Sequence, residues 1–448
     1  MKVKVISIKN FSVGLFSLLV LLFGFNLESH GLVVSLIIGY SLLVSFLFSR
    51  QSMLDPRSLF LIMLTVYSTW FPLQVIFFGY EGPLTIDGNV LLNSIKLQMF
   101  GIVVFVLVCM ALIDEDKISL SRRKFFNCLS MARKEHTSEA FIFWPILLFI
   151  LVAIMVTAGQ GHTTKREILD SGSVLKNISE LFFYVLLVIV MLITLRRGKQ
   201  LISYKAVMVV LVGLGFLLLL GERDVFFRVA ILGFLLFVDK KNIPVFVSVL
   251  FVVALAVIIV PLSQGLKAVF LSGEFSFTGL DLRLVFSNEF VSAGRNVYSL
   301  MYYGVDNSFS FIVHDVLRAF VPSVLFSGAE IQSTGSWFNS VYRLEHGFHG
   351  TSGWGFSLIA QGYLTSGYFG VFLIMTIAAT ILSMIYRKSY DTEYWYVFYL
   401  MALTTYVYII RADFANLLSQ VFKIGGFAVI GVYLGHYVFN KLRKLCAV

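Results

Sequence analysis

The chain has very little charge. Only 13% of its 448 residues are Asp, Glu, Lys or Arg, whereas soluble domains contain about 25%, and 58% of its residues are hydrophobic. The mean hydropathy is +0.88, and no polar stretch is long enough for a separate soluble domain. We therefore expect an all-α integral membrane protein in which residues 1–448 form a single integral-membrane domain.

Cysteine is scarce as well. Cys109, Cys128 and Cys446 form no CxxC pair, so a disulfide framework or a zinc site is not expected. We identify no DxD-type site that would demand a bound divalent cation, and we predict neither a metal site nor a cofactor. No internal repeat is visible either, which disfavours a transporter built from inverted halves.

Long apolar runs are abundant, and each helix that crosses a bilayer needs about 20 residues. They fall near 11–27, 31–49, 58–79, 91–113, 140–158, 179–195, 204–220, 225–238, 243–262, 354–386, 394–412 and 421–440. This spacing predicts a polytopic bundle of about 12 transmembrane helices. The basic N-terminus lacks a small-residue cleavage site after it, so the first run is expected to remain as a span.

Lysine and arginine indicate the orientation of these spans. With 12 alternating spans, 22 of the 35 basic residues fall on one side, which the positive-inside rule identifies as cytoplasmic. Both termini are then cytoplasmic. The net charge of +10 is explained by these basic loops, and we do not expect nucleic acid as a partner.

The other side of the membrane carries one large loop, residues 263–353, between spans 9 and 10. Loops of this size are usually functional. Amphipathic patches such as 307–326 predict short helices that lie at the membrane interface.

The basic residues on this outer side are mostly arginines, eight of 13, whereas lysine predominates on the cytoplasmic side. A planar fork of donors suits carboxylate or phosphate oxygens. Two short motifs, GERDVFFR (221–228) and RADF (411–414), place arginines beside spans. The candidate substrate-binding residues are Arg223, Arg228, Arg295, Arg318, Arg343 and Arg411. The alternatives are pairing with local acids and contact with lipid head groups.

A catalytic base is expected in the segment LEHGFHG. Histidine as a residue type titrates near neutral pH, and the segment contains His346 and His349, preceded by Glu345. These three are the catalytic candidates, with Asp315, His314 and Asp224 as rivals. Two exposed loop histidines without a catalytic role are the alternative. Among the surrounding aromatic residues, Tyr363 is a candidate for stacking on a sugar, although an interfacial aromatic belt also explains it.

The segment TSGWGFSLIAQGYLTSGYFG (351–370) is unusually rich in glycine for a membrane helix. Gly362, Gly367 and Gly370 permit kinks and close helix contacts. We therefore expect the run 354–386 to begin as a broken segment. Irregular backbone at membrane depth survives where it is buried in protein or lines a wet cavity, so this segment is expected to form the wall of an outward-opening cavity.

These three motifs together resemble those of Wzy-type O-antigen polymerases, the oligosaccharide repeat-unit polymerases of bacterial surface polysaccharide assembly. GWGFSLIAQGYLTSGYFG is similar to their G-x-G-x-S-x-x-A-E-x-Y-x-N-x-G-x-x-G segment, GERDVFFR to their G-x-R turn, and RADF to their R-x-D/G-F step. The chain departs from this pattern at two points: Gln361 replaces the usual glutamate, and Thr365-Ser366 replace the asparagine step. If that glutamate acts in catalysis elsewhere, this chain must use another group.

The resemblance implies a GT-C-like membrane glycosyltransferase that acts without a metal. It would join repeat units linked to undecaprenyl pyrophosphate into O-antigen, for lipopolysaccharide biosynthesis, or into a related surface polysaccharide, at the periplasmic face of the bacterial inner (plasma) membrane. Its partners would be undecaprenyl-pyrophosphate-linked oligosaccharide, membrane lipid and a chain-length regulator protein. The alternatives are an O-antigen ligase-like glycosyltransferase, a polysaccharide flippase or transporter, and a non-enzymatic scaffold.

Overall fold

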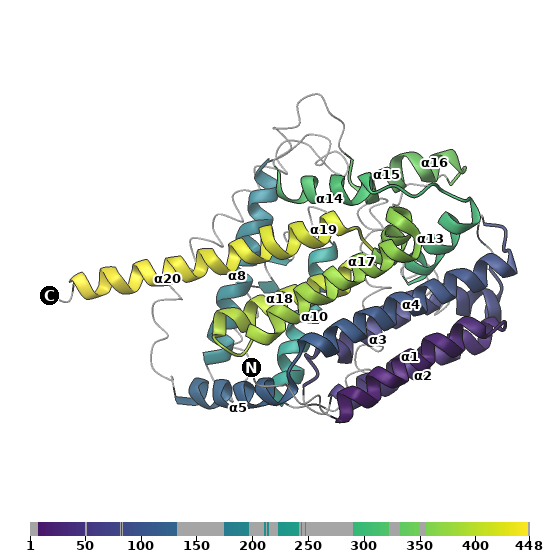
Figure 1. Cartoon of the computed structure of the whole chain (residues 1–448). Helices are drawn as coiled ribbons and strands as arrows, with labels where there is room; N and C mark the ends of the chain where they lie inside the picture. The colour runs from purple at the N-terminus through teal and green to yellow at the C-terminus, as the bar shows by residue number, and fades with distance from the viewer. Residues whose placement is uncertain are drawn as a thin grey trace.

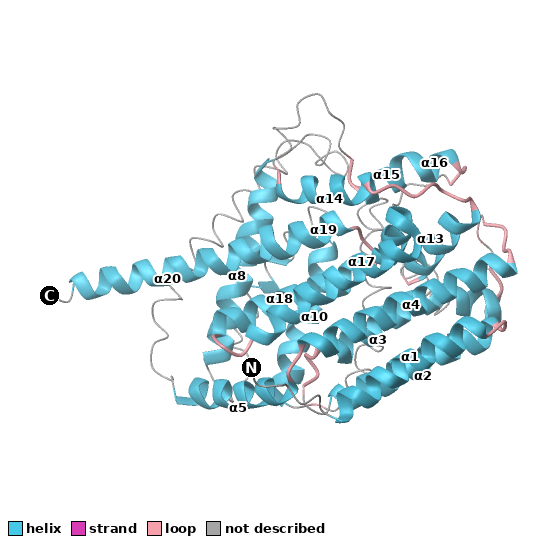
Figure 2. Ribbon diagram, in the orientation of Figure 1, coloured by secondary structure: helices cyan, strands magenta, loops and turns pink. Residues whose placement is uncertain are grey.

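The structure is a computed structural model of the whole chain. It describes residues 8–49, 52–80, 82, 84–131, 174–196, 210–211, 213–214, 223–241, 243, 247, 290–321, 332–348 and 355–446, and these residues are helical or lie in turns and loops (Figures 1 and 2). The N-terminal half contains α1 (Ile8–Asn26), α2 (His30–Ser49), η1 (Pro56–Phe60), α3 (Leu61–Leu73), η2 (Gln74–Phe78), α4 (Gly88–Leu112), α5 (Glu115–Met131) and α8 (Val174–Arg196). The C-terminal half contains α10 (Arg223–Lys241), α13 (Val291–Tyr302), α14 (Ser310–Phe320), α15 (Thr334–Trp337), η4 (Phe338–Tyr342), α16 (Arg343–Glu345), α17 (Leu358–Lys388), α18 (Glu393–Ile409), α19 (Phe414–Leu418), η5 (Ser419–Gly426) and α20 (Phe427–Cys446).

Among the described residues, six helical segments are long and apolar enough to cross a membrane, which is the architecture of a multi-pass membrane protein. They are Lys9–Asn26, His30–Ser49, Pro56–Phe78, Gly88–Leu112, Leu358–Lys388 and Phe414–Val438. The runs expected at 179–195, 225–238 and 394–412 coincide with the helices α8, α10 and α18. The expected span 140–158 and most of 204–220 and 243–262 lie outside the described residues, so the number 12 stays a prediction.

The core of the bundle is built around α4 and α17, which pack along each other (Figure 1). On one side α3 packs against α2 and α13, and on the other α18 packs against α10 and α17. These helices bury long apolar side chains together with small polar ones. Thr65 of α3, for example, donates a hydrogen bond to Ser41 of α2 over 2.7 Å.

Ion pairs tie helix ends together at one end of the bundle. Lys9 binds Glu115 at 3.0 Å, Arg122 binds Asp239 at 2.7 Å, and Arg196 pairs with Glu393. These residues come from segments that the charge pattern placed on one side, so the structure agrees with that grouping. We call this the ion-paired end; its cytoplasmic orientation stays a prediction.

The opposite end holds α14, α15 and α16, which run along the upper edge of Figure 1. Here the Tyr298 hydroxyl donates to the carbonyl oxygen of Thr85 at 2.7 Å, and the Ser308 amide donates to that of Leu364 at 2.9 Å. We call this the loop end, because it carries the described parts of the expected large loop 263–353.

The helix α17 is broken near its start, as its glycines suggested. Ser366 and Gly367 leave helical geometry, and Gly367 has a φ of 57°, a conformation that glycine adopts at little cost. The two helical pieces then meet closely. A Cβ atom on Gly370 would collide with the carbonyl oxygen of Gly362, so this crossing requires glycine.

Two helices of the expected loop differ in their surroundings. Nine of the 12 residues of α13 are buried, and it packs between α3, α4 and α17, so it is a core helix and not the interfacial helix that we expected. By contrast, α14 buries Asp315 and Ala319 and exposes a stripe of apolar side chains. That stripe, Phe309, Val313, Val316 and Phe320, is 39–53% exposed, as expected for a helix that lies at a lipid surface.

Candidate functional site

Two of the predicted arginines approach one aromatic ring towards the loop end. Arg228 projects from α10, and its guanidinium carbon lies 4.3 Å from the centroid of Tyr408 in α18. Arg411, in the turn after α18, lies 5.4 Å from the same centroid. The sum of these distances limits the separation of the two guanidinium carbons to 9.7 Å.

The packing of three helices fixes the Arg228 side chain. It is only 6% exposed, and its Nη1 donates to the Tyr184 hydroxyl of α8 at 2.8 Å. The face of an aromatic ring stabilises a nearby cation by about 0.5–2 kcal/mol. Two planar guanidinium groups from separate helices can bind adjacent phosphate groups, each through paired hydrogen bonds.

Next to Arg411 lies a buried network of carboxylates and neutral donors. Asp315 of α14 is fully buried. Its Oδ1 accepts a hydrogen bond from the Thr334 backbone amide at 2.8 Å, and its Oδ2 accepts one from the Thr334 hydroxyl at 3.0 Å. The Gln361 side-chain amide also donates to Oδ2. Asp315 thus accepts from three donors in α15 and α17.

Asp413 is the second carboxylate of this network and is 1% exposed. Its Oδ2 accepts from the Gly335 amide at 2.8 Å. Its Oδ1 accepts from the backbone and side-chain amides of Asn416, at 2.8 and 2.7 Å. Asp413 is therefore the N-cap of α19 and at the same time binds α15.

The electrostatics of Asp315 follow from this setting. Burial, followed by the nearby charge of Asp413, raises the pKa of the Asp315 carboxyl to about 7, because both disfavour its ionised form. The hydrogen bonds from Thr334 and Gln361 oppose this rise. Asp315 therefore titrates near neutral pH, as a proton acceptor or donor would.

The expected base His346 has an aromatic environment. Its ring stacks on Tyr303 with centroids 3.8 Å apart and meets Tyr342 edge-on at 4.5 Å. Glu345, beside it, is exposed. His349 lies outside the described residues, so the structure brings neither a second histidine nor a buried acid to His346 among the residues it describes.

The remaining predicted residues are spread over the loop end. Arg343 is 9% exposed, Arg318 is exposed on α14, and Tyr363 is half-buried on the first piece of α17. Arg295 of α13 hydrogen-bonds with Tyr80. Arg223 begins α10, but its side chain lies outside the described part. Arg228 and Arg411 are thus the two predicted arginines that the structure places on one ring.

Several residues of the site were missed by sequence reasoning. Tyr408 precedes Arg411 by three residues, the spacing of one helical face, and this signal could have been used. Gln361 was noted only as a departure from a family pattern. Tyr184 and Thr334 carry no sequence signal, because ordinary loops and helices are rich in such residues.

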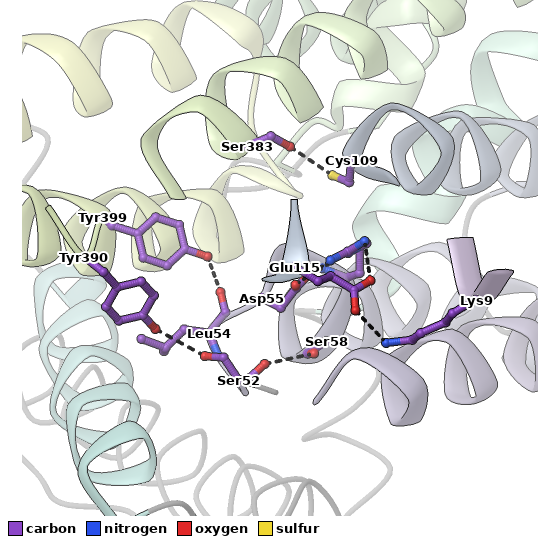
Figure 3. Close-up of polar contacts among 11 residues, drawn as sticks. Lys9, Ser52, Leu54, Asp55, Ser58, Cys109, Glu115, Ser383, Tyr390 and Tyr399 are labelled. Carbon is purple, nitrogen blue, oxygen red and sulfur yellow. Dashed lines mark hydrogen bonds and ion pairs between the residues drawn. The ribbon is translucent and has the colours of Figure 1, made fainter. Parts of the chain in front are cut away.

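A second polar cluster lies at the ion-paired end (Figure 3). Arg57 is fully buried and donates to both oxygens of Asp55, at 2.9 and 2.7 Å. Its guanidinium carbon lies 3.6 Å from the Phe48 ring centroid, and Glu115 is 3.5 Å from its Nη1. Such a paired, enclosed arginine is suited to fixing helix positions.

No group of three or more histidine, cysteine, aspartate or glutamate side chains able to hold a metal ion occurs in the described ranges. Compared with known proteins, the chain matches no family model, no curated protein and no solved structure.

Proposed function

We propose that the protein is a membrane glycosyltransferase that polymerises oligosaccharide repeat units carried on a polyprenyl diphosphate. The observation that supports it most is the placement of Arg228 and Arg411 over the ring of Tyr408. Two cations from separate segments of the chain suit a diphosphate, the group that links glycan and lipid carrier. The reaction would take place at the periplasmic face of a bacterial inner membrane.

In this reaction a hydroxyl of the acceptor sugar attacks the anomeric carbon of the donor glycan. The bond from that carbon to the diphosphate oxygen breaks, and the lipid diphosphate leaves with additional negative charge. Arginines fixed before the reaction stabilise this charge without the reorganisation that water would need. The hydroxyl proton must go to a base, and Asp315, whose pKa is raised to about 7 by burial and by the charge of Asp413, joins His346 as a candidate.

A lipid-linked substrate also needs access from the membrane. The exposed apolar stripe of α14 lies on the helix that carries Asp315. Phe320 at its end lies 6.2 Å, centroid to centroid, from Phe422 of η5, which leads into the apolar α20. Exposed apolar side chains on α14 and η5 would therefore give the lipid chain of a substrate an approach to the elements around the site.

The glycan ladder of a bacterial strain that lacks the chain tests this proposal. Restoring the native chain is expected to restore long polysaccharide, whereas Arg411→Ala and Arg228→Ala leave single-repeat surface glycan only. Arg387→Ala is the matched control, because Arg387 is exposed at the far end of α17. Unchanged ladders for both arginine variants, at equal protein levels, would refute the proposal. Loss of all surface glycan, single repeats included, would favour a ligase instead.

A further inference from the structure

We propose that Gln361 is a positioning residue that holds the turn bearing Arg411 in place, and that it does so by bonding Asp315 and the backbone of Phe414 at once. This inference rests on the proposed function, because the purpose of the positioning is to aim Arg411 at a diphosphate. Gln361 does not itself touch the substrate in this proposal.

Gln361 uses both ends of its side-chain amide, although it is fully buried. Its Nε2 donates to Asp315 Oδ2 and lies 3.3 Å from the Thr334 hydroxyl. Its Oε1 accepts from the backbone amide of Phe414 at 2.6 Å. Loss of the bond between Oε1 and the Phe414 amide would deprive two buried polar groups of this partner, which is costly.

Two hydrogen bonds from the segment 355–361, which leads into α17 and includes its first turn, hold the turn between α18 and α19. The Phe356 amide donates to the carbonyl oxygen of Arg411 at 2.8 Å, and Gln361 binds the amide of Phe414. Gly355, at a φ of 66°, lets the chain pass so close that a Cβ there would lie 2.9 Å from the same Arg411 oxygen. The backbone of Arg411 is therefore fixed between two contacts from one segment.

The direction of the donors makes this arrangement specific. In its ionised form Asp315 offers only acceptors, and it receives three hydrogens, from the Thr334 amide, the Thr334 hydroxyl and Gln361. An asparagine at position 315 would bring its own NH₂ against either the Thr334 amide or the Gln361 NH₂, whichever way it is oriented. A glutamate at position 361 would instead set its carboxylate against that of Asp315.

The two changes together exchange donor and acceptor. In the pair Asp315→Asn and Gln361→Glu, the NH₂ of the introduced asparagine donates to the introduced carboxylate, whose second oxygen still accepts from Phe414. The Thr334 hydroxyl, 3.3 Å from the Gln361 nitrogen in the native chain, can then donate to the carboxylate oxygen that takes the place of this nitrogen. The total charge is that of the native network, so the double variant is expected to recover the stability and the lipid binding that each single variant loses.

The experiment measures two quantities on the purified full-length chain: the melting temperature and the dissociation constant for undecaprenyl diphosphate. We expect Asp315→Asn and Gln361→Glu each to weaken binding by about tenfold or more, the usual effect of disturbing a hydrogen bond to a charged group. The double variant is expected to bind within about threefold of the native chain, a difference small against the tenfold loss.

Three results would overturn the inference. The first is a double variant that binds as poorly as the singles combined. The second is single variants that melt earlier but bind normally when folded, which would make the network structural only. The third is single variants with no effect at all. The variant Arg411→Lys separates this inference from the proposed function: if it binds the lipid normally, the proposed function fails, whereas if it binds weakly and Gln361→Glu binds normally, only the positioning role fails.

Discussion

Arg228 and Arg411 lie over the same ring, that of Tyr408, although Arg228 comes from α10 and Arg411 from the turn after α18. Arg228 is held in place by Tyr184, and Arg411 by the turn that Gln361 and Phe356 bind. The two cations are therefore brought together by four helices, α8, α10, α17 and α18. An anionic ligand bound beside this ring would be attracted by both cations.

The ring of Tyr408 is the first point to test. Tyr408→Leu removes the face on which both guanidinium groups rest, and we expect binding of undecaprenyl diphosphate to fall by about threefold to 30-fold, as two weakened cation–ring contacts imply. Tyr408→Phe keeps the ring and is expected to lose much less. Equal affinities for the Leu and Phe variants would show that the ring does not organise the arginines.

The raised pKa of Asp315 predicts how stability depends on pH. The pKa is about 7 in the folded protein against 3.8 for an ordinary aspartate, so between these pH values the folded chain binds a proton more tightly than the unfolded chain. The contribution of this group to folding is largest below pH 4, falls as pH rises to about 7, and is constant above it. Among the groups that act on Asp315, Asp413 is a carboxylate, whereas Thr334 and Gln361 are neutral.

Melting temperatures of the native chain and of Asp315→Asn, taken from pH 4 to pH 8, check this sign. The native chain is expected to lose more stability over this range than the variant, whose amide does not titrate. Parallel pH profiles would mean that Asp315 keeps its ordinary pKa.

The crossing of the two pieces of α17 predicts a strict need for glycine. A Cβ on Gly370 would collide with the carbonyl oxygen of Gly362, and backbone cannot move aside as a side chain can. We expect Gly370→Ala to cost about 1–3 kcal/mol or more, as other overpacked sites do. Gly435→Ala is the control, since nothing lies within 4 Å of that position in α20, and it is expected to be neutral or stabilising by up to about 1 kcal/mol. Similar melting temperatures for both variants would contradict the close crossing.

At the ion-paired end, Arg57 and Asp55 are expected to act as one unit. Arg57→Met leaves a buried carboxylate without its cation, which costs about 3–5 kcal/mol in comparable pairs. The double change Asp55→Asn and Arg57→Met removes both charges and is expected to recover most of that loss. Thermal unfolding measures the stability of each variant, and a double variant less stable than Arg57→Met would refute a paired role. Lipid binding by folded molecules is expected to stay unchanged, because this cluster lies at the end away from Tyr408.

The fold was largely predictable where a single physical rule determines it. Run length locates α1 to α4 and α17, because a bilayer of fixed thickness sets the number of apolar residues. The distribution of lysine and arginine predicted which loops lie on the same side, and the contact of Lys9 with Glu115 is an example of two such segments that meet. The break in α17 followed from its glycines. The burial of α13 did not follow, because a helix of 12 residues with several polar side chains has the composition of a surface helix.

The site was predictable only in its residue types. Arginine on the loop side indicated an anion, but hydropathy does not reveal which arginines meet, since the approach of Arg228 to Tyr408 depends on how α10 packs on α18. The hydrogen bond between Gln361 and Asp315 joins α17 to α14, which are far apart in the sequence, so no local sequence pattern predicts it. His346 was chosen for its residue type, whereas the raised pKa of Asp315 arises from burial beside Asp413, which only a folded chain has.

A double-mutant cycle on lipid binding tests the central claim most directly. The dissociation constant for undecaprenyl diphosphate is measured for the native chain, Arg228→Lys, Arg411→Lys and the double variant, with Arg387→Lys as the control. If both arginines hold one diphosphate, each single change weakens binding by about tenfold or more, and the double change costs clearly less than the product of the two, because residues that share a ligand group are coupled. Single variants that bind as tightly as the control, or effects that multiply independently, would contradict the account.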